Sequence, residues 1–511
     1  MEEGIRSFAC TFGRMNVLSP GLILVVIMVY FVGLITISWL TSRGSNTREF
    51  FTANRQSPWM LVAFGMIGAT LSGVTFISTP GTVGAGKANM NFSYMQMVFG
   101  YLVGYYVIAT VLMPLYYRMN LTTIYGYFRE RFGTVSYRTG AGFFLLSRII
   151  GASFRLFLVA IVLQNFVLGP FGIPLWMTVA LTILLIWIYT FQGGIKTIVW
   201  TDTLQTTCLL ASVMLTILAI GQSMDLNLGE MWAAMGDAGY TEMWYFEGGW
   251  GDPNNFFKQF IGGALLAIVM TGMDQDMMQK NLTCKSLSDA QKNMFTFSII
   301  LVFANVLFLS LGAMLYIYAG QIGMAVPERP DLLFPQIALT ELGPFVGLTF
   351  IVGLIAAAYS SADSALTALT TSFCVDFLDF ETTKRSEATK KKLRIQVHIV
   401  FSIVLFFVII LFDSLNNDSI LNQLFRAAGY TYGPILGLFS FGMLTSRLVL
   451  DRYALAVCLI APVLSFMVDK YSAQLFGGFS FGFMILALNG LLTFCGLWLI
   501  SSRPSTQVTN Q

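Results

Sequence analysis

The chain has 511 residues, of which 56% are hydrophobic and 11% charged, and its mean hydropathy is +0.71. Soluble proteins average about 25% charged residues, so this composition excludes a soluble globular protein. The net charge of +3 gives no evidence for any particular partner, and no nucleic-acid partner is expected. The apolar runs are long and apolar all round rather than short and alternating, which predicts an all-α integral membrane protein.

Thirteen stretches are long and apolar enough to be membrane spans, since crossing a bilayer as a helix takes roughly 20 residues. In chain order they are 17–40, 58–84, 92–117, 140–168, 172–191, 196–221, 257–279, 292–320, 342–376, 394–413, 427–446, 450–469 and 476–501.

The Lys and Arg residues predict the orientation, because cytoplasmic loops are enriched in them. One set of alternate loops holds twenty, Lys280 among them, and the other set holds seven, while Arg148 and Arg155 lie within a span. We therefore expect the N-terminus outside and the C-terminus inside. The expected location is the plasma membrane (the bacterial inner membrane), with membrane lipids as partners.

Two spans contain residues that weaken a continuous helix. They stand five apart in order, so they enter the membrane from opposite sides. That arrangement is typical of an inverted repeat with one discontinuous helix in each half, which in transporters marks the binding site. The alternative is that these glycines only allow close helix packing. The residues concerned are Gly68, Gly73, Pro80, Gly81, Gly84 and Gly86 in the second span, and Gly262, Gly263, Gly272 and the polar Asp274-Gln275-Asp276 in the seventh.

The span 342–376 carries a row of hydroxyls beside a carboxylate, Asp363. Ala357, Ser360, Ser361 and Ser364 share one helix face. An ionisable group at this depth is a functional hypothesis by default, and hydroxyls together with free carbonyls suit a small hard cation. We interpret this face as one wall of a monovalent cation site. The alternative is that the hydroxyls bond back to their own helix.

Three passages then make the sequence recognisable. They are GGIKTIVWTDTLQT (193–206), AAAYSSADSALTA (356–368) and DQDMMQKNLT (274–283). Together they resemble the solute:sodium symporter family, whose members include sodium-coupled carriers of sugars, proline, sialic acid, iodide and vitamins. The resemblance implies a LeuT-like 5+5 inverted-repeat fold, Na⁺ as the coupling ion, a small organic solute as cargo, and no enzyme activity.

The resemblance also implies a division of the chain. A leading helix and the first cytoplasmic loop occupy 1–56. The first repeat, core helices 1–5, occupies 57–256 and ends in an extracellular loop, 223–256. The second repeat, core helices 6–10, occupies 257–448, and two trailing helices with a cytoplasmic tail occupy 449–511.

The family's sodium ligands can be carried over residue by residue. The first site falls on the hydroxyls of Ser360 and Ser361 and the carbonyls of Ala357, Gly73 and Phe76. A second sodium, which some relatives hold, falls on Asp202, Asp363 and Ser364. Asp363 stands where the family has a hydroxyl, so it strengthens a second site or serves as a proton-linked carboxylate. The number of ions stays open.

The solute is expected between the broken helices. The implied residues are Thr75, Ser78 and Thr79 from the first core helix, and Ala267, Met270 and Thr271 from the sixth. Arg155 is a further candidate, because sialic-acid carriers of the family use an arginine on the same helix, about one turn earlier, near Gly151. Arg155 has two interpretations: it holds a substrate carboxylate, or it pairs with Asp202 or Asp363.

The preferred cargo is an anionic or carboxylate-bearing sugar such as sialic acid, and a neutral sugar or polyol is the alternative. Two alternatives belong to other functional classes: a channel, and a proton-pumping subunit of a respiratory complex. The latter needs a chain of Lys, Glu or His at the membrane midplane, and this sequence has only one histidine.

Overall fold

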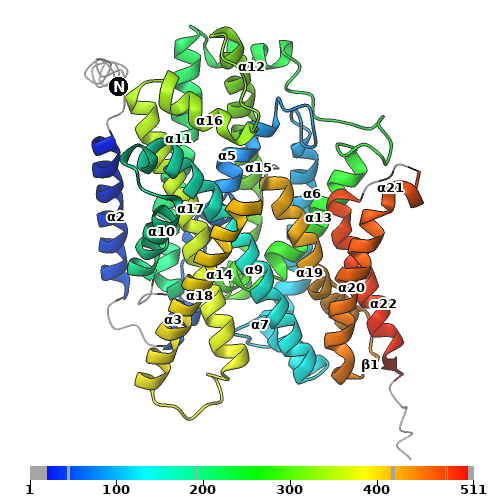
Figure 1. Ribbon diagram of the computed structural model, residues 1–511. Coiled ribbons are helices and arrows are strands. Elements are labelled where there is room, and N and C mark those ends of the chain that lie inside the picture. Colours follow the sequence, from blue (N-terminus) through cyan, green and yellow to red (C-terminus); the bar gives the residue numbers. More distant parts are fainter. Residues whose placement is uncertain are drawn as a thin grey trace, which may run out of the picture.

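The computed structural model describes residues 20–42, 47–190, 194–415, 420–477, 479 and 481–503. Within these ranges the chain is a bundle of helices, as predicted, with one short antiparallel strand pair, β1 (Leu448–Val449) and β2 (Ser501–Ser502) (Figure 1). The N-terminal segment 1–16, the start of the first predicted span, Gly193 of the first motif and the end of the tail lie outside the described residues.

Each of the thirteen predicted spans coincides with a helix or with consecutive helices. The first six are α2 (Pro20–Ser42), α4 (Trp59–Thr70) with α5 (Gly73–Thr82), α6 (Tyr94–Val107) with η2 (Ile108–Leu112) and α7 (Met113–Arg118), α9 (Thr134–Leu163) with η3 (Gln164–Leu168), α10 (Leu175–Thr190), and α11 (Gly194–Ser223). The other seven are α13 (Phe256–Ala267) with η5 (Ile268–Gly272) and α14 (Gln275–Asn281), α15 (Leu287–Gln321), α17 (Pro344–Ser372) with η8 (Phe373–Phe377), α18 (Glu387–Leu415), α19 (Ile420–Leu444), α20 (Ala454–Lys470), and α22 (Ile485–Leu499).

Among the described helices, nine are long and apolar enough to cross a membrane, and two bent pairs raise that number to eleven. The count of thirteen and the orientation stay predictions.

Shorter elements connect these helices. They are α3 (Thr47–Thr52), η1 (Ala53–Arg55), α8 (Gly126–Arg131), η4 (Gly169–Phe171), α12 (Leu228–Asp237), η6 (Pro330–Leu332), α16 (Leu333–Gln336), η7 (Ile337–Glu341), η9 (Asp451–Tyr453), α21 (Ser472–Leu475) and η10 (Gly482–Met484). The helix α12 lies in the predicted outside loop, at one end of the bundle (Figure 1), and begins with a capping box formed by Asn227 and Glu230.

Both predicted breaks are confirmed. The helices α4 and α5 meet at an angle of 57°, and the second pair, which ends in α14, bends by 68°. The second break has a local cause in Asp274, whose carboxylate accepts hydrogen bonds from the backbone N–H groups of Asp276 (2.9 Å) and Met277 (3.3 Å). An N-cap of this kind starts a new helix, so the chain turns at Asp274 instead of continuing α13.

The hydroxyl-bearing helix α17 lies at the centre of the bundle, against α11, α9, α18 and α4. In its most apolar window 78% of the residues are buried, compared with 28% in α2 and 22% in α20, which lie at opposite edges (Figure 1). The polar groups of α17 must therefore find partners within the protein.

Candidate functional site

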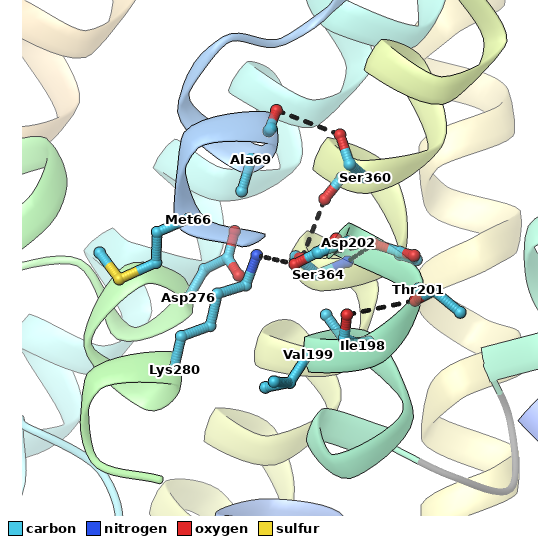
Figure 2. A network of polar contacts seen from close by, with 12 residues as sticks. Met66, Ala69, Ile198, Val199, Thr201, Asp202, Asp276, Lys280, Ser360 and Ser364 are labelled. Carbon is cyan, nitrogen blue, oxygen red and sulfur yellow. Dashed lines mark hydrogen bonds and ion pairs between the residues drawn. The ribbon is translucent and has the colours of Figure 1, made fainter. Parts of the chain in front are cut away.

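The hydroxyls of Ser360 and Ser361 lie against the last turn of α4. Ser360 Oγ donates to the carbonyl oxygen of Gly68 (3.1 Å) and is 3.3 Å from that of Ala357, and Ser361 Oγ donates to the carbonyl oxygen of Ala69 (3.3 Å). Figure 2 shows Ser360 beside the turn that carries Ala69. Two hydroxyls and three carbonyls thus gather where α4 ends, and oxygens of this kind are ligands for a hard cation.

Among the described residues, Gly73 and Phe76, the predicted carbonyl ligands, form no hydrogen bond with Ser360 or Ser361, whose hydroxyls bond to Gly68, Ala357 and Ala69. Both belong to α5, on the other side of the break, and the Phe76 ring packs on Phe334 and Phe350, with centroids 5.1 and 5.6 Å away. The α-helix α4 ends at Thr70, so the carbonyls left without continuing helical partners are those of its own last turn. The break thus comes earlier in the chain than the family alignment assumed.

Asp202 of α11 forms a buried ion pair with Lys280 of α14. The distance from Lys280 Nζ to Asp202 Oδ2 is 2.6 Å, and the two side chains are 1% and 0% exposed. Figure 2 shows Lys280 reaching to Asp202. A Cβ on Gly65 of α4 would lie 2.9 Å from Asp202 Cβ, so only glycine lets α11 approach α4 this closely.

The sequence did not predict this ion pair, because Lys280 was expected among the positive charges of a cytoplasmic loop. The only sequence signal for its role was its place in the motif that begins at Asp274, six residues earlier. Neither charge pattern nor spacing distinguishes a loop lysine from one that turns into the bundle.

Asp363 is held by neutral donors. Its Oδ2 accepts from the phenol of Tyr189 on α10 (2.8 Å), and its Oδ1 accepts from the backbone N–H of Ser364 (2.5 Å). Ser364 Oγ donates to the carbonyl oxygen of Ser360 (2.9 Å). Of the three residues predicted for a second sodium, Asp363 and Ser364 are neighbours in the chain, and Asp202 is paired with Lys280. The sequence did not predict Tyr189 as the partner of Asp363.

A cavity beside the break of α4 and α5 brings together most of the predicted solute residues: Thr75, Arg155, Ala267, Met270 and Thr271. Its wall includes three tyrosines of α6 and two residues of α15: Tyr94, Tyr101, Tyr105, Leu301 and Asn305. Ser78 and Thr79 lie further along α5, outside this lining. Their hydroxyls are buried without a hydrogen-bond partner among the described residues.

Two arginines of α9 border this cavity, and they differ in their partners. Arg148 forms ion pairs with Asp276 and with Asp274, the latter at 3.8 Å, and Tyr432 donates to Asp274. Arg155 is 7% exposed, and its Nε and Nη1 have no hydrogen-bond partner in the described part of the chain. The alternative pairing of Arg155 with Asp202 or Asp363 is wrong, because those carboxylates bind Lys280 and Tyr189.

A helical membrane bundle in which two broken helices and a hydroxyl-rich helix surround a central cavity defines a secondary transporter. Residues 50–460 match the model of the "SSF: Sodium:solute symporter family". The chain belongs to this family.

Relatives and solved structures agree with this assignment. The sodium/sialic acid symporter NanT of Aliivibrio fischeri is 25% identical over 452 residues, which span 86% of this chain and 85% of the relative. A solved structure of a Na⁺-coupled sialic acid symporter, substrate-bound and outward-open, has a TM-score of 0.77 at 19% identity and covers 94% of this chain and 99% of that one. Mhp1, a nucleobase-cation-symport-1 family transporter, has a TM-score of 0.55 at 16% identity, with coverage of 88% and 94%.

These matches confirm the predicted LeuT-like fold, the multi-pass membrane localisation and the transporter class in place of an enzyme. The protein is a sodium-coupled symporter of a small solute.

Proposed function

We propose that the cargo is a small carboxylate-bearing solute, with a carboxylated sugar such as sialic acid as the first candidate. The observation that carries this proposal is the buried Arg155 guanidinium, which lines the cavity with two nitrogens that lack partners among the described residues. An arginine at membrane depth costs at least about 2.5–3.5 kcal/mol. A carboxylate that enters the cavity offsets this cost, because its two oxygens match the planar fork of a guanidinium.

The first sodium ion binds, in this proposal, at Ser360 and Ser361, with carbonyls from Ala357, Gly68 and Ala69 in place of the predicted Gly73 and Phe76. The hydrogen bonds between these hydroxyls and carbonyls give way to sodium–oxygen contacts when the ion enters. The work comes from the ion gradient, since one charge moving through 100 mV is worth about 2.3 kcal/mol.

The break between α4 and α5 links the ion to the cargo. Its α4 side carries Gly68 and Ala69, and its α5 side carries Thr75, which lines the cavity. A sodium ion that fixes the last turn of α4 therefore also fixes the cavity wall. On the other side, Ala267, Met270 and Thr271 come from the second broken helix. Ser78 and Thr79 are proposed to contact the solute only when α5 moves.

The proposed domain organisation keeps the predicted boundaries, with repeats at 57–256 and 257–448, a leading segment 1–56 and a trailing segment 449–511. Membrane lipids surround the helices, and no nucleic-acid partner is proposed.

A thermal-shift screen of the purified protein tests the cargo. Carboxylated sugars, neutral sugars and polyols are compared at high and zero sodium, because a ligand that binds the native state raises the apparent stability. We expect stabilisation by a carboxylated solute that depends on sodium, followed by sodium-driven uptake of that solute in proteoliposomes. Stabilisation by a neutral polyol, with none by any carboxylate, would contradict the proposal.

A further inference from the structure

We propose that the ammonium of Lys280 takes the place of a second sodium ion, so that this symporter couples one Na⁺ to each solute. This inference rests on the proposed first sodium site, and it assigns Asp202 to a fixed internal cation in place of a transported one.

The geometry places the ammonium where a second ion would bind. Lys280 Nζ lies 2.6 Å from Asp202 Oδ2 (Figure 2). A sodium ion bound to the same carboxylate would lie within a few ångströms of this ammonium. Two like charges that close, in a region shielded from water, repel strongly.

The helix that carries Lys280 is fastened on each side of this residue. Gln279 Nε2 donates to the carbonyl oxygen of Phe51 (2.7 Å) and to Thr371 Oγ1 (3.0 Å). Asn293 Nδ2 donates to Asn281 Oδ1 (2.6 Å), and Thr283 Oγ1 donates to the carbonyl oxygen of Lys280 itself (2.7 Å). Because α14 is held by α3, α15 and α17, the ammonium stays beside Asp202 as long as these contacts persist.

The charges of this region also balance with a single ion. Asp202 and Asp363 are fully buried, and when both are ionised they bring two negative charges. Lys280 compensates one of them, and a sodium ion at Ser360 and Ser361 compensates the other. A second sodium ion would leave one positive charge in excess, and buried uncompensated charge is costly.

The stoichiometry is measured as the ratio of ²²Na⁺ to solute taken up by proteoliposomes, together with the Hill coefficient for sodium. For the wild type we expect a ratio of one and a Hill coefficient of about one. A solute with one negative charge would then enter without net charge, so that uptake does not respond to an imposed membrane potential.

The substitution Lys280→Gln should convert the position into an ion site. The freed carboxylate of Asp202 recruits sodium, so the Hill coefficient rises toward two and the thermal stability of the variant depends more steeply on sodium than that of the wild type. The double variant Lys280→Gln/Asp202→Asn carries no net charge at this position and should return to a Hill coefficient of one. The control Lys390→Gln removes a lysine that is 3.8 Å from the exposed Glu387 and should change neither quantity.

Two results would overturn the inference: a wild-type ratio of two sodium ions per solute, or a Lys280→Gln variant whose sodium dependence equals that of the wild type. If Lys280→Gln does not fold, the wild-type ratio and the charge-neutral double variant still decide the question. A ratio of two leaves sodium-coupled symport intact. Failure of the proposed first sodium site would instead appear as unchanged sodium affinity in Ser360→Ala and Ser361→Ala, a result distinct from either of these two.

Discussion

Two buried regions at the centre of this symporter differ in whether a charged side chain has an ion-pair partner. Around Asp202, the carboxylate has its cation within the chain, in Lys280. In the solute cavity, the guanidinium of Arg155 has no ion-pair partner among the described residues. The desolvation cost is of the same kind in both places. If Arg155 binds the carboxylate of the cargo, as proposed, then the chain supplies the counter-charge of Asp202 and the cargo supplies that of Arg155.

The same contrast appears within a single helix. Arg148 and Arg155 stand seven residues apart on α9, about two turns, so they point to similar sides of the helix. Arg148 forms ion pairs with the two carboxylates at the start of α14, and Arg155 forms none with either of them. The break at Asp274 therefore decides which arginine is structural.

The largest expected effect is on stability, from Arg148→Ala. This substitution leaves Asp276 buried without its cation, and breaking a buried pair in this way costs about 3–5 kcal/mol. Thermal unfolding of the purified protein without solute checks it. The matched variant Arg155→Ala, on the same helix, removes a buried charge that has no ion-pair partner among the described residues, so the unfolding temperature should stay the same or rise. Equal losses in the two variants would erase the distinction between the two arginines.

Next in size is the effect of Arg155→Lys on solute binding. Lysine keeps the charge but loses the bidentate fork, and hydrogen bonds to charged groups contribute about 1.5–3 kcal/mol. The affinity for a carboxylated solute should fall roughly 10- to 100-fold. Calorimetry at saturating sodium measures the solute affinity, and sodium binding without solute serves as the control that should survive. Unaltered affinity for the transported solute would show that Arg155 binds no carboxylate.

A smaller loss is expected for Ser360→Ala and Ser361→Ala. Each deletes one oxygen from the proposed sodium site, and we expect sodium affinity to fall about tenfold, or about 1.4 kcal/mol. The sodium concentration that gives half-maximal uptake is the measurement. Ser402→Ala is the control, because among the described residues this hydroxyl bonds to its own helix, at the carbonyl oxygen of His398 (2.9 Å). If both site variants behave like Ser402→Ala, the sodium ion binds elsewhere.

The smallest effect is expected from Arg138→Ala. Arg138 Nη2 lies 3.7 Å from Asp379 Oδ2, and the two side chains are 50% and 45% exposed. Exposed pairs contribute about 0–1 kcal/mol, so the free energy of unfolding should change by no more than that. A loss of stability as large as that of Arg148→Ala would mean that burial does not determine how much these ion pairs contribute to the free energy of unfolding.

The sequence by itself determined the features that depend on one segment at a time. The long apolar runs fixed the helical membrane class, because every backbone polar group in lipid must bond within its own helix. Glycine, proline and Asp274 located both breaks, because helix propensity and capping act over a few residues. The period of 3.6 residues placed Ala357, Ser360, Ser361 and Ser364 on one face.

Only the tertiary structure decided which of these groups meet. It paired Lys280 with Asp202, which is 78 residues away in the chain, although the sequence placed that lysine in a cytoplasmic loop. It set the serines of α17 against Gly68 and Ala69 instead of Gly73 and Phe76, and it gave Arg148 partners that Arg155 lacks among the described residues. Local propensity carries no information about the distance between side chains on remote helices, and the strength of an ion pair or a cation site depends on that distance.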